Sequence, residues 1–139
     1  MATAGRGPTP AQAFCGLVGV VLIAAGALGF IGDASFGGPD ERGTFLGLDV
    51  NGWHNIVHIA TGAIGLLVAG YAARQYALYL GIVYLVIAAW GFIIGNGDSI
   101  LGFIPVNTED NFLHLILGAL GVGAAMATPV EGARPVAAT

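Results

Sequence analysis

The sequence predicts an all-α integral membrane protein, a bundle of four transmembrane helices. Only 9% of its 139 residues are charged, 56% are hydrophobic, and lysine is absent. Soluble domains carry about 25% charged residues, so a water-facing surface is not expected. Four apolar runs are each long enough to cross a hydrocarbon core of about 30 Å as a helix: Ala13–Ile31, Asn55–Ala73, Tyr76–Gly95 and Phe112–Thr128. Four spans are too few for a closed barrel, so no strand is expected.

The chain is predicted to be a single membrane domain over residues 1–139, because this length suits one domain. The domain would consist of two tandem, similarly oriented helical hairpins, at residues 13–73 and 76–128. The tails, at 1–10 and 129–139, are rich in Ala, Pro and Thr, and we expect them to be flexible. The first run is long for a signal peptide, so we expect it to be retained.

The few charges predict how the runs are oriented. Three of the four arginines, Arg6, Arg74 and Arg134, fall in the tails or in the turn after the second run. The other two loops contain Arg42 and seven acidic residues. Because Lys and Arg are enriched in cytoplasmic loops, both termini are expected in the cytoplasm.

The second and fourth runs begin with similar stretches, VNGWHNIVHIATGAIG (Val50–Gly65) and VNTEDNFLHLILGALG (Val106–Gly121). Seven positions are identical without a gap, among them the polar pairs Asn51/Asn107, Asn55/Asn111 and His58/His114. Just upstream, LGLDVN resembles LGFIPVN with one insertion. The first and third runs match more weakly, through IAAGALGF and IAAWGF with a two-residue deletion. We interpret this as a duplication of one hairpin, with a pseudo-two-fold axis along the membrane normal.

The repeat also predicts how the helices pack. Helices in lipid associate through close contact over small residues, since lipid tails are as apolar as the helices. The expected packing positions are Gly26, Gly29, Gly62, Gly65, Gly118 and Gly121.

A polar cluster is expected in the outer third of the bundle. His54 and His58 are four residues apart and share one helix face, and the repeat maps them onto Asp110 and His114. At 1.5 Å per residue, His58 and His114 lie about 10 Å from the outer starts of their runs.

Three interpretations of this cluster remain open. The first is a structural hydrogen-bond network that joins the two halves. The second is a metal site for Zn²⁺, or less specifically Fe²⁺ or Mn²⁺, with His54, His58, Asp110 and His114 as ligands. Its supporting residues would be Asn55, Asn111 and Glu109. The third is haem b held between His58 and His114, with Gly62 and Gly118 leaving room for the macrocycle.

Other function classes have little support. Four dispersed arginines make no nucleic-acid surface, and neither Ser35 nor Ser99 lies in a nucleophile motif. We therefore expect no enzyme, and a small structural or accessory subunit of a membrane complex without catalytic activity. A metal- or haem-binding membrane protein is the alternative. The expected partners are the lipid bilayer and other membrane subunits or a second copy of the chain.

The chain resembles an uncharacterised bacterial four-helix membrane family, domain of unknown function four-three-eight-three. The resemblance rests on W-H-N-x-x-H-x-x-x-G in the second run and D-N-x-L-H-x-x-x-G in the fourth, and extends over Ala13 to Thr128. It implies a multi-pass protein of the bacterial cytoplasmic (inner) membrane. It implies no reaction.

Overall fold

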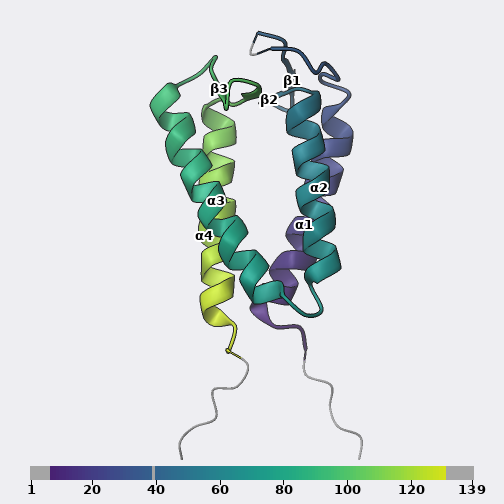
Figure 1. Ribbon diagram of the computed structural model, residues 1–139, viewed down its shortest axis with the longest axis vertical. Coiled ribbons are helices and arrows are strands. Elements are labelled where there is room, and N and C mark those ends of the chain that lie inside the picture. Colours follow the sequence, from purple (N-terminus) through teal and green to yellow (C-terminus); the bar gives the residue numbers. More distant parts are fainter. Residues whose placement is uncertain (1–6, 39, 131–139) are drawn as a thin grey trace, which may run out of the picture.

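The four helices are arranged as two antiparallel pairs (Figure 1). In this computed structural model, which describes residues 7–38 and 40–130, α1 spans Pro10–Gly29, α2 Gly52–Val68, α3 Ala73–Ile94 and α4 Thr108–Ala127. α1 packs mainly on α2, and α3 packs mainly on α4. Arg6, Glu131 and Arg134, and residues 1–6 and 131–139 of the two predicted tails, lie outside the described residues.

Three helices of the described chain, α1, α3 and α4, are long and apolar enough to cross a membrane. α2 is apolar but shorter, with 17 residues. Large apolar side chains such as Leu17, Leu67 and Ile93 are exposed on the outward faces of these helices. The chain is therefore a membrane protein, and its exposed apolar faces contact lipid.

The two pairs join through an apolar core at the end where α1 begins and α4 finishes. Ala11, Phe14 and Cys15 of α1 are buried there against Ala77 of α3 and Ala125 of α4. At the opposite end, loops and short strands bridge the pairs (Figure 1). The two halves thus meet at both ends of the molecule, through the helices at one end and through the loops and hairpins at the other.

Every helix begins three or four residues before its predicted span. Thr9 and Gln12 form a capping box at the start of α1, and the asparagines at positions 51 and 107 cap α2 and α4. Capping side chains accept hydrogen bonds from the first free backbone N–H groups of a helix. The polar residues in these first turns lower the local hydropathy. The predicted start of each span therefore lies too far toward the C-terminus.

The expectation of no strand was wrong. Each half carries a small antiparallel hairpin between its helices: β1 (Gly43–Phe45) with β2 (Leu48–Val50), and β3 (Ser99–Ile100) with β4 (Ile104–Pro105). The turns contain Leu46 and Gly47, with φ of 52° and 88°, and Leu101 and Gly102, with φ of 54° and 79°. Leucine rarely adopts positive φ, so the Leu-Gly pairs lack the Asn-Gly or Asp-Gly signature that predicts a hairpin.

The two pairs make equivalent internal contacts. A Cβ atom on Gly62 would meet the carbonyl of Gly19, and one on Gly118 would meet that of Gly81. A Cβ on Gly29 would likewise meet the side chain of Asn55, and one on Gly91 that of Asn111. Gly19 and Gly29 are as far apart in the sequence as Gly81 and Gly91. The contacts therefore match α1 to α3 without the two-residue deletion inferred from the sequence.

All six glycines predicted as packing positions lie where a Cβ atom would meet a neighbouring helix. The residues they approach are Asn55 and Ile59 for Gly26, Asn55 for Gly29, Gly19 and Ile23 for Gly62, Tyr76 for Gly65, Gly81 and Leu85 for Gly118, and Phe14 and Ala77 for Gly121. The close approach of α1 to α2 requires Gly26, Gly29 and Gly62, and that of α3 to α4 requires Gly118 and Gly121. Gly65 leaves room on α2 for the ring of Tyr76 on α3.

The contact at Gly62 predicts a strong effect of one added methyl group. Gly62→Ala would press a Cβ against the backbone of Gly19 and Ile23, which no side-chain rotation relieves. We expect the free energy of unfolding to fall by about 1–3 kcal/mol, as for other overpacked sites, measured by denaturant titration in detergent micelles. Gly123→Ala is the matched control, because nothing lies within 4 Å of a Cβ there. Equal losses in both variants would contradict this account.

Candidate metal centre

Two asparagines fix the N-terminal ends of α2 and α4 relative to each other. The side-chain oxygen of Asn51 accepts from the backbone N–H of His54 at 2.9 Å, and that of Asn107 accepts from Asp110 at 2.9 Å. Their amide groups donate across the molecule, Asn51 to the carbonyl of Phe103 at 2.7 Å and Asn107 to that of Gly47 at 2.8 Å. Each cap thus ties the helix of one half to the hairpin of the other.

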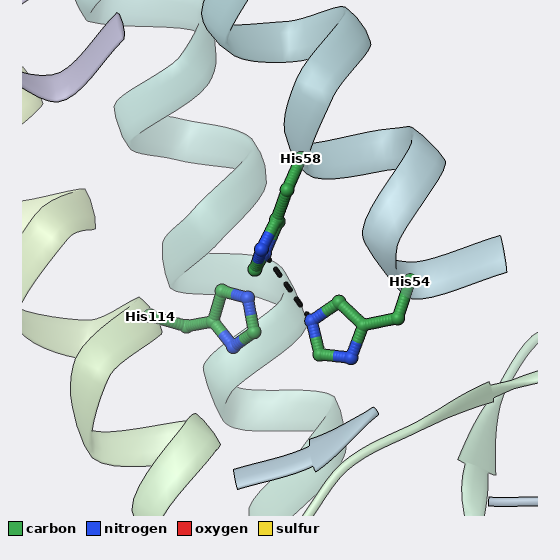
Figure 2. Close-up of side chains that lie close together, drawn as sticks. All are labelled: His54, His58 and His114. Atoms are coloured by element: carbon green, nitrogen blue, oxygen red, sulfur yellow. Dashed lines mark hydrogen bonds between the residues drawn. The ribbon is translucent and has the colours of Figure 1, made fainter. Parts of the chain in front are cut away.

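The three histidines of the chain converge between the halves (Figure 2). One ring nitrogen from each of His54 and His58 on α2 and His114 on α4 lies within 4.8 Å of the others. Only 1% of His54 and 7% of His114 is exposed, and His58 is partly buried. Three imidazole nitrogens at this separation are a candidate donor set for one metal ion.

The backbone of Asp49 sets the tautomer of His54. The Nδ1 atom of His54 lies 3.0 Å from the carbonyl oxygen of Asp49, which can only accept a hydrogen bond. The neutral ring therefore carries its proton on Nδ1 and directs the lone pair of Nε2 toward the Nε2 atom of His58, 3.2 Å away. Either His58 donates a proton to this lone pair or both nitrogens bind a common ion. A backbone carbonyl behind the distal ring nitrogen is the usual support of a metal-binding histidine.

His114 is held within its own half by an aromatic contact with α3. The ring of Tyr84 on α3 meets the ring of His114 edge-on, with centroids 5.0 Å apart and planes at 84°. Within the described residues, the hydroxyl of Tyr84 and the Nδ1 atom of His114 are buried without a hydrogen-bond partner. Sequence reasoning missed Tyr84. Its signal was a tyrosine at mid-span, where anchoring at the membrane surface does not explain it.

Asp110 lies beside the cluster, but its carboxylate is engaged elsewhere. It accepts from the backbone N–H of Asp49 at 3.0 Å and of Asn107 at 3.3 Å. Among the described residues, the group of converging ligand atoms contains the three histidines and not this carboxylate. His54 and Asp110, which the repeat maps onto each other, are instead joined by a bridge through the backbone of Asp49, which donates to Asp110 and accepts from His54.

Comparison with known protein families shows to which family the chain belongs. Residues 12–127 match the family model described as Domain of unknown function (DUF4383). The chain belongs to this family. No curated protein and no solved structure matches the chain.

In this DUF4383 chain, the residues predicted to support the histidines lie in other contacts. The Asn55 amide donates to the carbonyl of Asp33 at 2.9 Å, and its side chain packs on Gly29. Asn111 packs on Gly91 in the same way, and Glu109 is exposed in the first turn of α4. The asparagines therefore hold each helix pair together, while the backbone of Asp49 and the ring of Tyr84 support the histidines.

The two roles of Asn51 can be separated by substitution. Asn51→Ala removes the cap and the bond to Phe103, and we expect it to destabilise the protein by about 1–3 kcal/mol, from a lost cap and a lost buried hydrogen bond. Asn51→Ser keeps a capping oxygen but not the amide donor, so its loss should be about half as large. Thermal unfolding followed by circular dichroism measures both, and identical losses would mean that the cross-half bond contributes nothing.

Proposed function

We propose that this chain is a four-span protein of the bacterial inner membrane that binds one divalent metal ion, zinc foremost, through His54, His58 and His114. The single observation that carries the metal proposal is the convergence of three imidazole nitrogens within 4.8 Å, from the buried His54 and His114 and the partly buried His58. The proposal concerns binding, and it includes no catalytic step.

The length and packing of α2 support four spans. α2 contacts α1 along its length, and its 17 residues are at the short end of the range that crosses a bilayer. Two similar hairpins in the same orientation would then form the bundle, and the contacts shared by the two pairs support a duplication. The acidic outer loops, with Arg74 in the opposite turn, favour cytoplasmic termini.

The geometry of the donors supports a small ion. Tetrahedral zinc with bonds of about 2.0–2.1 Å holds its ligands about 3.3 Å apart, close to the 3.2 Å between the Nε2 atoms of His54 and His58. His114 would need to approach by up to about 1.5 Å, the difference between the 4.8 Å limit on the present separations and this spacing, which a rotation of its side chain can supply. Three histidines then leave a fourth coordination position open.

The same geometry weakens the haem alternative. A macrocycle centred between His58 and His114 would need a clear plane between their rings. The ring of His54 lies in the way, since its centroid is 4.4 Å from that of His58 and 6.3 Å from that of His114. A single ion uses His54 as a third ligand, so it accounts for all three rings.

A role as an accessory subunit remains part of the proposal, supported by small residues on outward helix faces. Gly16 of α1 and Gly123 of α4 have nothing within 4 Å of a Cβ position. A helix of another subunit, or of a second copy, can approach closely over such residues.

Metal analysis of the purified chain tests the proposal. After exposure to zinc and removal of excess, we expect about one zinc per chain by mass spectrometry of metals, and binding weakened more than about 100-fold in His54→Ala and His114→Ala. Zinc at 100 times its dissociation constant should stabilise the fold by about 2.7 kcal/mol.

Trp53→Phe is the control, since it lies next to His54 in the sequence and offers no ligand atom. It should keep the metal and the stabilisation. Substoichiometric zinc that is unchanged in the histidine variants would overturn the proposal. A Soret band lost in His58→Ala would favour haem instead.

A further inference from the structure

A cavity of about 270 Å³ leads from the surface of the protein to the histidine cluster. Its walls are apolar side chains of α1 and of the β1–β2 hairpin. The polar residues that line it are His54, His58 and Asp110. The cavity therefore has an apolar body and a polar end.

The mouth of the cavity lies among exposed apolar side chains. Val21 and Leu28 of α1 are each 49% exposed, and Leu46 at the hairpin tip is 87% exposed. In the proposed four-span arrangement, this face of α1 is in contact with lipid. A molecule dissolved in the outer part of the bilayer can enter the cavity through this mouth. Its apolar portion then stays in an apolar environment throughout.

The charges at the polar end of the cavity determine which kind of ligand head group can bind there. Three neutral imidazoles leave the two positive charges of a bound ion uncompensated, and Asp110, the one carboxylate among the residues that line the cavity, supplies one negative charge. A net charge enclosed by apolar walls is strongly unfavourable. One further anionic ligand at the open fourth position makes the site neutral.

Resting on the metal site proposed above, we propose that the cavity binds a long-chain carboxylate, a free fatty acid, whose head group occupies the fourth position of the metal ion. The cavity volume is slightly below the about 300–1,000 Å³ of typical ligand pockets. That size suits a single alkyl chain and not a two-chain lipid.

Cobalt-loaded protein in phosphatidylcholine nanodiscs tests this, because the visible bands of tetrahedral Co²⁺ report a change of its fourth ligand. Laurate should shift the bands saturably at one equivalent. Methyl laurate, which lacks the anionic oxygen, should cause no shift. Acetate, which lacks the chain, should require at least about 100-fold higher concentration, because the apolar contacts of the chain are absent.

A matched pair of variants on α1 tests the cavity itself. Ala25 lines the cavity, whereas Ala27 of the same helix is exposed and lies outside its lining. Ala25→Leu should weaken laurate binding by about tenfold or more, since methylenes of the chain lose their contact surface. Ala27→Leu should bind laurate as the unsubstituted protein does, and both variants should bind cobalt equally.

The outcomes separate the two proposals. Absence of histidine-dependent cobalt binding would overturn the metal site and the fatty-acid site with it. Cobalt bound through the histidines, with bands that laurate leaves unchanged or that acetate shifts equally well, would overturn only the fatty-acid proposal. Equal weakening in Ala25→Leu and Ala27→Leu would also overturn it, because binding would then not depend on this cavity.

Discussion

The end of the molecule that carries the hairpins depends on the reciprocal hydrogen bonds of Asn51 and Asn107. The first N–H groups of a helix have no partner within the helix, so a buried helix start must satisfy them through other groups of the protein. Each asparagine does this with its oxygen and uses its amide to hold the opposite hairpin. The same two side chains thus begin both helices and set the distance between the halves. The positions of the histidines follow from that distance.

The histidine site is asymmetric, although the two halves of the molecule are similar. His58 and His114 are equivalent positions of the proposed duplication, but His54 corresponds to Asp110. The carboxylate of Asp110 turns back to accept from the backbone of Asp49 and Asn107, as the third residue of a capping box does. His54 projects toward the other rings instead, with its Nδ1 atom on the carbonyl of Asp49. One substitution in a repeated hairpin therefore supplies a third nitrogen donor.

Hydropathy and the repeat predicted the four helices, the packing glycines and the nearness of the histidines, because these features follow from composition and helical spacing. The strands were not predictable in this way, since Leu46 and Leu101 hold positive φ without a turn signature. The contacts of Asn55 were also missed. Its amide donates to the carbonyl of Asp33, a choice fixed by how closely α1 approaches α2 and not by the position of Asn55 on its own helix.

The two ends of the interface between the halves are stabilised by different forces. At the end where α1 begins, small and apolar side chains around Ala11 and Ala77 pack closely, which needs no specific partner. At the end that carries the hairpins, more specific contacts join the halves. These are the two asparagine amides, the bonds from Arg42 to the carbonyls of Gly97 and Asp98, the bridge through Asp49, the contact of Trp53 with Phe103, and the histidine rings. Among these contacts, those of the histidine rings depend on whether an ion is bound. A single hydrogen bond joins His54 to His58, whereas one ion would join all three rings and both halves. A ligand on that ion would then affect how firmly the two halves are joined at the hairpin end, since the cavity that leads to the ion has walls from α1 and the β1–β2 hairpin.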